Sequence, residues 1–221
     1  MGLTAFSRTP EQNVNLIESS LAQAIGMNAA FQVDLATATG KTPSAGSDGN
    51  EVVVDSAKAD GQKFLFSELE SIHTRFPDVQ GVLGQWFLSR FDYMLDLRGQ
   101  RLEFGKQDRN GTRARFTMLN GRPAISTNLG DLVLDSGAAR LVLFGVEPYA
   151  GYAREVSMRT LTGSQVAGLA PRTLIVEGRT IWHGDAVAIP NRPEPAVYGL
   201  MPLSLFKQVY FCNSENYVIL Q

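Results

Sequence analysis

The chain has few of the residues on which covalent cross-links and metal sites depend. Its 221 residues include one cysteine, Cys212, and two histidines, His73 and His183. A single cysteine excludes an intrachain disulfide and a cysteine-based zinc site. The two histidines lie far apart in the sequence and lack the paired spacing of metal ligands. We therefore expect no metal site and no cofactor.

Long hydrophobic runs and an excess of one charge are also missing. Apolar stretches such as Leu141–Val146 are far shorter than the roughly 20 residues of a membrane-spanning helix. The 20 basic residues are scattered and balanced by 22 acidic ones, for a net charge of -2, so no basic patch indicates nucleic acid. We expect no membrane span and no nucleic-acid partner. The first residues show no signal peptide, and the compartment stays open between a soluble protein and export of a longer form.

What the chain has is enough apolar residues for a folded core and many short β-forming segments. Apolar residues make up 44% of the chain and charged residues 19%. Turn-rich stretches, above all 40–50, separate the β-forming segments, which predicts an all-β fold with a few short helices. One helix is expected at Asn15–Ile25, ended by Gly26. The expected strands include Phe31–Ala36, Glu51–Val54, Lys63–Phe66, Gly81–Leu83, Arg115–Leu119, Ala124–Thr127, Asp131–Leu134, Ala139–Phe144, Arg154–Leu161, Arg172–Val176, Thr180–Ile189 and Tyr217–Leu220.

Internal similarity predicts two lobes. Val82–Phe91 matches Val197–Phe206 at a constant offset, with shared Val, Gly, Leu, Ser and Phe. Thr37–Gly40 resembles Thr160–Gly163 at a similar separation, close to half the chain. The polar stretch around residue 110 reads as a connection. We therefore expect an N-terminal lobe at 1–105, a linker at 106–114 and a C-terminal lobe at 115–221.

One motif carries candidate chemistry. An apolar strand, Leu132–Leu134, runs into Asp135, Ser136, Gly137 and Ala138. The strand delivers a carboxylate to a tight loop in which the serine can form hydrogen bonds and the glycine permits close backbone approach. Asp-Ser-Gly also starts ordinary turns in β proteins, so this reading stays open beside the catalytic one. A serine-hydrolase site built on Ser136 has no nucleophile-elbow motif to support it.

The motif, a hairpin after it and a hydrophobic-Gly element near the C-terminus together resemble the retropepsin-like aspartic protease family. The resemblance implies two acid-protease β-barrel lobes with short helices. It implies a catalytic loop of Asp135, Ser136 and Gly137, and substrate-binding residues at Ala138 and at two hairpin tips. The residues at those tips are Thr39, Gly40, Thr160, Leu161, Thr162 and Gly163. The expected function is an aspartic endopeptidase that hydrolyses polypeptides without a cofactor.

The chain departs from the family pattern in its first lobe. The family spacing puts a first Asp-Thr-Gly near Thr4–Arg8, but no aspartate precedes Asp34. The chain is then either a two-lobe protease that lacks its front or one whose first lobe has degenerated. The resemblance leaves two sources for a second aspartate: Asp135 of a second chain in a homodimer, or a segment ahead of this chain. The alternative function is an inactive protease-fold module that binds extended peptides or mediates dimerisation.

Overall fold

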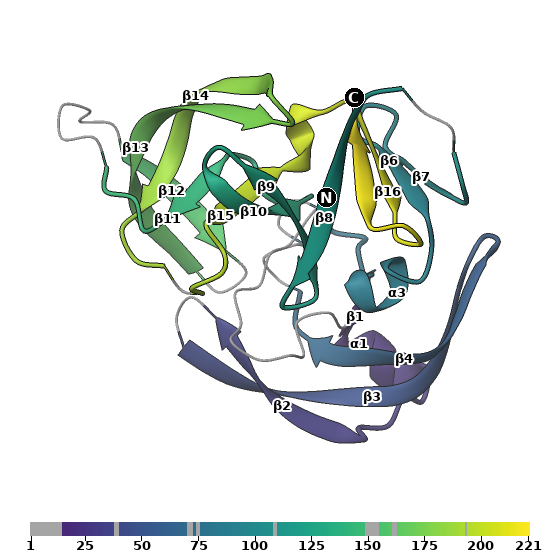
Figure 1. Ribbon diagram of the computed structural model, residues 1–221. Coiled ribbons are helices and arrows are strands. Elements are labelled where there is room, and N and C mark those ends of the chain that lie inside the picture. The colour runs from purple at the N-terminus through teal and green to yellow at the C-terminus, as the bar shows by residue number, and fades with distance from the viewer. Residues whose placement is uncertain are drawn as a thin grey trace. The chain divides into compact units, whose positions relative to one another are not determined.

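The computed structural model describes residues 15–37, 40–69, 73, 76–107, 110–148, 155–160, 163–192 and 194–221. The chain divides into two compact units, an N-terminal unit that ends at Phe91 and a C-terminal unit of Asp92–Gln221. Strands dominate both units and the helices are short, which confirms the all-β prediction (Figure 1). The helices of the described residues are too short and too polar to cross a membrane.

The division between the units lies earlier than the predicted linker at 106–114. Residues 93–104 form the hairpin of β6 and β7, and β6 pairs with β16 near the end of the chain. This pairing brings residues assigned by sequence to the first lobe into the C-terminal unit. Residues 112–114 belong to β8, not to a linker.

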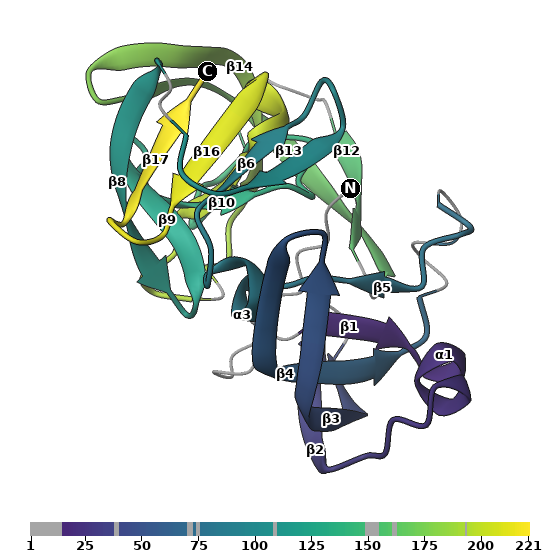
Figure 2. The same cartoon turned by 90° about the vertical axis from the view of Figure 1, so that its right-hand side faces the viewer.

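The N-terminal unit is built on a five-stranded sheet with the order β2-β3-β4-β1-β5. Helix α1 lies beside β1 and β4 (Figure 2). The elements of this unit are β1 (Asn15–Glu18), α1 (Ser19–Ala24), β2 (Phe31–Thr37), β3 (Gly40–Val54), β4 (Ala57–Ser67), β5 (Gly81–Val82) and α3 (Gln85–Leu88).

The segment Asn15–Ile25, predicted to be one helix, forms a strand followed by a shorter helix. Its first four residues form β1, which pairs in parallel with β4 and antiparallel with β5, and α1 follows directly. The apolar pair at its start fits helix and strand periodicity equally well, and pairing on both sides favours the strand. Gly26 ends the helix as expected, with a φ of 73° and its N–H donated to the Gln23 carbonyl.

The turn-rich stretch 40–50 also lies in a strand, contrary to the prediction. It forms the first part of β3, which pairs with β2 on one side and with β4 on the other. The ladder to β4 is irregular around Asn50, where the register shifts twice. Pro43 pairs with β2 alone, and Ser47 and Gly49 lie at the irregular part of the ladder to β4, two settings in which these residue types are tolerated.

The C-terminal unit contains a twelve-stranded sheet with the order β12-β13-β14-β11-β15-β10-β9-β8-β17-β16-β6-β7. Its central strand β10 is a run of apolar residues, and Leu132 and Val133 are almost completely buried. The elements are β6 (Tyr93–Asp96), β7 (Arg101–Phe104), β8 (Thr112–Leu119), β9 (Arg122–Thr127), β10 (Gly130–Asp135), β11 (Val142–Phe144), β12 (Glu155–Thr160), β13 (Gly163–Val176), β14 (Arg179–Ile189), β15 (Gly199–Pro202), the 3-10 helix η1 (Leu203–Leu205), β16 (Gln208–Cys212) and β17 (Tyr217–Leu220).

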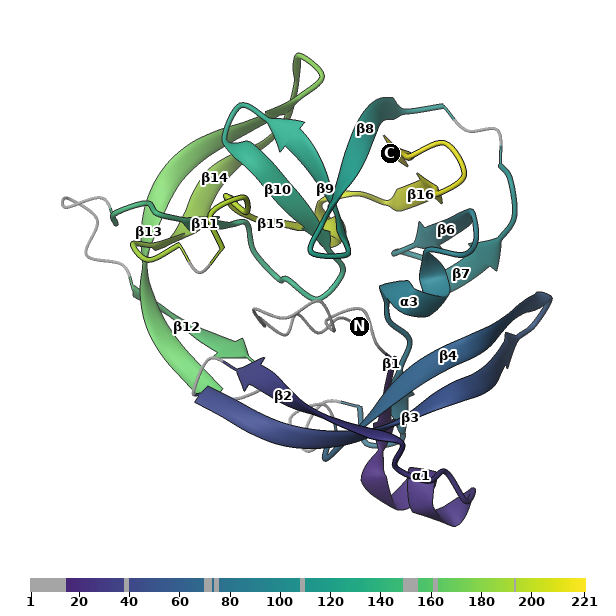
Figure 3. The same cartoon turned by 60° about the horizontal axis from the view of Figure 1, so that its bottom comes forward.

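A five-strand module occurs once in each unit. The N-terminal order β2-β3-β4-β1-β5 is repeated as β12-β13-β14-β11-β15. In both, the fourth strand is parallel to the third and antiparallel to the fifth. The hairpins β2–β3 and β12–β13 close with matching pairs, Thr37 opposite Gly40 and Thr160 opposite Gly163 (Figure 3). The internal repeat expected from the sequence is thus present in the topology.

The register corrects one detail of that repeat. The sequence match pairs Gly84 with Gly199, whereas the strands make Gly81 the counterpart of Gly199. Gly81 lies opposite Ile17 on β1, and Gly199 lies opposite Leu143 on β11. A Cβ at Gly81 would meet the carbonyl of Leu16, and one at Gly199 would meet the carbonyl of Val142. Both glycines are required because a neighbouring strand approaches too closely for a side chain.

Candidate active-site loop

Asp135 is the last residue of β10, a strand held from both sides. β10 pairs antiparallel with β9 and parallel with β15, where Asp135 lies opposite Pro202. The strand ends at Asp135 because the chain turns away through Ser136 and Gly137. The carboxylate thus sits at the end of a buried, doubly paired strand, which fixes its backbone.

The Asp135 side chain is buried and hydrogen-bonded to its own loop. The residue is 6% exposed. Its Oδ1 accepts hydrogen bonds from the N–H of Gly137 at 2.7 Å and of Ala138 at 3.1 Å. Burial raises the pKa of the carboxyl, while these two N–H groups and the charge of Arg122 act in the opposite direction. The net effect is a pKa above the ordinary value, so the carboxyl holds its proton to a higher pH.

The other residues of the predicted loop are more accessible. Ser136 is exposed, and Gly137 and Ala138 are partly buried. The structure therefore brings Asp135, Gly137 and Ala138 together through hydrogen bonds and leaves Ser136 facing solvent. An exposed face beside a buried carboxylate is the arrangement that lets a reactant approach the loop.

The residues predicted at the hairpin tips are described only in part. Thr160 ends β12 and Gly163 begins β13, so the predicted hairpin exists in the same unit as Asp135. Leu161, Thr162 and Thr39 lie outside the described residues. Gly40 begins β3 in the N-terminal unit. The substrate-binding role of these residues stays a prediction.

Sequence reasoning missed a buried polar cluster next to the loop. Arg122, the first residue of β9, donates to Oε1 and Oε2 of Glu194 at 2.7 and 2.6 Å, and Asn120 donates to Oε2 at 2.5 Å. Arg122 and Glu194 are 8% and 6% exposed. The available signal was an arginine at the head of the otherwise uncharged segment Arg122–Thr127. Glu194, in a proline-rich loop, gave no comparable signal.

The serine-hydrolase alternative finds no support in the described contacts. His183 lies within β14 opposite Thr173, and its Nδ1 is 2.8 Å from the Thr173 hydroxyl. The turn of this hairpin lies at Glu177–Gly178, between β13 and β14. His183 is therefore engaged within its own hairpin rather than with Ser136.

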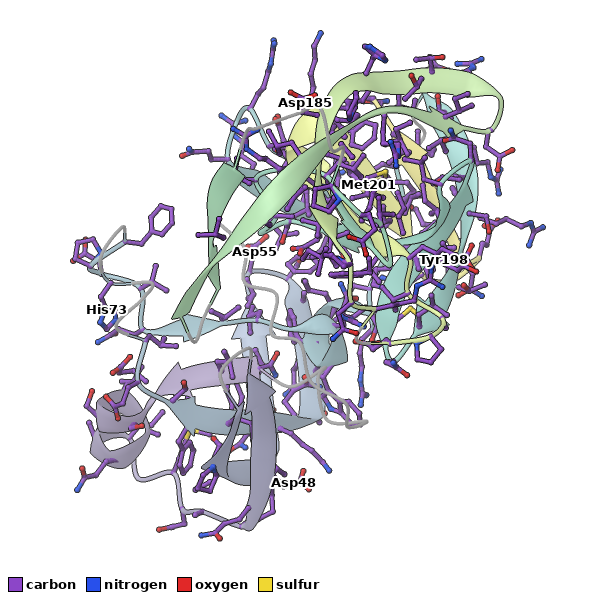
Figure 4. All side chains as sticks on the ribbon, turned by 90° about the vertical axis from the view of Figure 1, so that its left-hand side faces the viewer. Asp48, Asp55, His73, Asp185, Tyr198 and Met201 are labelled. Carbon is purple, nitrogen blue, oxygen red and sulfur yellow. The ribbon has the colours of Figure 1, made fainter. Side chains whose placement is uncertain are left out.

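The N-terminal unit offers few carboxylates comparable to Asp135. Asp48 and Asp55, labelled in Figure 4, are exposed on β3 and on the turn after it. Among the described side chains of this unit, Glu18 is the one buried carboxylate. It accepts a hydrogen bond from the Leu69 N–H at 3.1 Å and lies 3.6 Å from His73. Glu18 is therefore committed to structural contacts at the end of β1.

Two comparisons with known sequences identify no relative. No protein-family model matches the chain, and no curated protein sequence matches it. The function is therefore argued from the loop geometry and the strand topology.

Proposed function

We propose that this protein is an aspartic-type endopeptidase with a retropepsin-like architecture of two related β lobes, and that Asp135 is a catalytic aspartate. The observation that carries the proposal is the setting of Asp135. It ends a buried strand, two backbone N–H groups of its loop hold it, and burial raises its pKa. The repeated five-strand module supports the two-lobe architecture.

The proposed reaction needs two carboxyl groups that share one proton. The ionised carboxylate takes a proton from a water molecule, whose oxygen bonds to the scissile carbonyl carbon. The protonated carboxyl donates its proton to the carbonyl oxygen. The tetrahedral diol then collapses: the first carboxyl gives its proton to the amine nitrogen as the C–N bond breaks, and the second carboxylate takes a proton from a diol hydroxyl, which becomes the new carbonyl oxygen. With a raised pKa, Asp135 is suited to hold the one proton that the two carboxyl groups share.

Two sources of the second carboxyl follow from the resemblance: Asp135 of a second chain, or a segment that precedes this sequence. The first source makes active enzyme a dimer. Specific activity would then rise with protein concentration and level off as dimers saturate. Sedimentation velocity under the same conditions would show the dimer appearing over the same concentration range. Specific activity independent of concentration, in a protein that stays monomeric, would contradict the dimer source.

The direct test is peptide hydrolysis by the full chain at mildly acidic pH. Asp135→Asn should lower the cleavage rate about 10²–10⁴-fold, as expected for loss of acid–base catalysis. Asp131→Asn is the matched control, because Asp131 lies on the same strand and its Oδ1 accepts from Ser126 at 2.6 Å on the exposed side. Equal activity in the two variants would sink the proposal, and so would the absence of cleavage both by the unmodified chain and by a longer form that carries a preceding segment.

A specific observation favours a second candidate, a protease-fold module that binds extended peptides without cutting them. Asp135 lies seven residues before Val142 of β11, and Leu16 is the counterpart of Val142 in β1. Seven residues before Leu16 stands Thr9, which has no carboxyl group. The two candidates separate in one experiment: fluorescence anisotropy of labelled peptides shows tight binding, while mass spectrometry of the same samples shows either fragments or intact peptide.

A further inference from the structure

The charged side chains buried in the described part of the C-terminal unit gather at one place. They are Arg122, Asp135 and Glu194, each less than one-tenth exposed. Buried charges are destabilising unless they are paired and hydrogen-bonded. Arg122 begins β9, Asp135 ends β10 and Glu194 lies in the loop before β15, so we treat the three buried charges together.

Arg122 and Glu194 form a pair held on several sides. The Arg122 Nη2 contacts both oxygens of Glu194, and Asn120 adds a third hydrogen bond to that carboxylate. Asn120 and Gly121 make the tight turn between β8 and β9, with φ values of 48° and 70°. The Glu194 carbonyl accepts from the N–H of Val197, just ahead of β15. The pair thus joins the β8–β9 turn to the loop before β15.

The strand register brings Arg122 to Asp135. Val133 of β10 lies opposite Ala124 of β9. Continued by two residues, this antiparallel register puts Asp135 opposite Arg122, where cross-strand side chains share one face. The charge of Arg122 indeed acts on Asp135. Arg122 Nε and Nη1 are buried and have no hydrogen-bond partner among the described residues, so part of the guanidinium is not committed to Glu194.

From this geometry we infer that Arg122 and Glu194 are positioning residues that set the charge state of Asp135. Glu194 holds the guanidinium and compensates its charge, so that Arg122 stabilises the Asp135 carboxylate only in part. A contribution of Arg122 and Glu194 to catalysis rests on the proposed function of Asp135. The electrostatic link itself does not depend on catalysis.

Of the two strands that pair with β10, β9 carries one charged side chain and β15 carries none. β15, on the far side of β10, has the sequence Gly-Leu-Met-Pro and carries no titratable side chain. β9 contributes Arg122 alone, and the loop before β15 contributes Glu194. Loss of the Glu194 charge should therefore leave Arg122 uncompensated next to Asp135, and the ionised aspartate should become more stable.

The test is a carboxyl-carbon NMR titration of Asp135 in the full chain. Glu194→Gln keeps the shape of the side chain and should lower the pKa of Asp135 by about one unit, a tenfold change in proton dissociation. The double variant Arg122→Met with Glu194→Gln removes both charges and should raise the pKa above that of the unmodified protein. Glu215→Gln is the matched control, because Glu215 forms an exposed ion pair with Arg113, and it should leave the pKa unchanged.

The double variant separates electrostatics from damage to the fold. Exposure of Asp135 by local unfolding would lower its pKa in both variants, whereas the Arg122 charge predicts opposite directions. A lowered Asp135 pKa in both the single and the double variant, or an unchanged Asp135 pKa in Glu194→Gln, overturns the inference. If Glu194→Gln fails to fold, Asn120→Gly weakens the hold on Glu194 without changing a charge. A lowered pKa of Asp135 in Asn120→Gly would then support the inference, and an unchanged pKa would refute it.

The outcome is independent of turnover. Opposite pKa shifts in a protein that cuts no peptide would uphold the electrostatic link and reject the proposed function. Cleavage that depends on Asp135, in a protein whose Asp135 pKa does not change in Glu194→Gln, would uphold the proposed function and reject the electrostatic link.

Discussion

The two units share a five-strand module but differ in what lies next to its fifth strand. In the C-terminal unit β15 has β10 as a parallel partner and is four residues long. In the N-terminal unit β5 is the edge strand of the described sheet and is two residues long. The strand that carries Asp135 therefore also joins the five-strand module to the rest of the sheet of its unit. The candidate Asp135 loop and a large part of the packing therefore depend on the same strand.

The largest expected effect comes from the third strand of each module, at equivalent core positions. Leu65 lies opposite Leu16 and is fully buried, and Val187 lies opposite Val142 and is 1% exposed. Leu65→Ala should lower the unfolding free energy by about 3 kcal/mol and Val187→Ala by about 2 kcal/mol, because the larger deletion leaves the larger cavity.

The chain's two tryptophans allow this measurement unit by unit. Trp86 lies in the N-terminal unit and Trp182 in the C-terminal unit. Urea unfolding followed by fluorescence in single-tryptophan variants should show Leu65→Ala in the Trp86 signal and Val187→Ala in the Trp182 signal. Interchanged signals would show that the two positions do not belong to equivalent modules of separate units.

Losses somewhat smaller than that of Leu65→Ala are expected at the paired glycines. A Cβ at Gly199 would press on the Val142 carbonyl more tightly than one at Gly81 would press on the Leu16 carbonyl. Gly199→Ala should destabilise its unit by about 2–3 kcal/mol and Gly81→Ala by about 1 kcal/mol, both through strain between strands. The same unfolding assay checks the order. A larger loss for Gly81→Ala would contradict the equivalence drawn from the strand register.

Local sequence patterns predicted the fold class and the position of the Asp135 loop. They failed for segments whose structure depends on strand partners far away in the sequence. The all-β class and the doubled hairpins follow from alternating apolar residues and turn residues, and Tyr217–Leu220 forms a strand with the expected bounds. Asn15–Glu18 was assigned to a helix because a short apolar run fits both periods, and its two strand partners are distant in sequence. The β6–β7 hairpin joined the other unit for the same reason. Glu194 could not be linked to Asp135 because 58 residues of intervening chain separate them in sequence.

The smallest expected effect is a pH dependence confined to the C-terminal unit. Because the pKa of Asp135 is raised in the folded state, the folded protein binds the proton more tightly than the unfolded chain. Stability should then fall as pH rises from about 4 through the folded-state pKa. Asp135→Asn removes that loss and retains an oxygen for the Gly137 and Ala138 N–H groups. Its melting temperature relative to the unmodified protein should therefore rise by about 2–4 °C between pH 4 and pH 7. The rise should appear in the Trp182 signal alone, whereas Asp131→Asn should show none. The same rise in the melting temperature followed by Trp86 would show that the Asp135 charge also affects the stability of the N-terminal unit. A relative melting temperature of Asp135→Asn that falls between pH 4 and pH 7 would show that the pKa of Asp135 is lowered in the folded protein, contrary to the prediction.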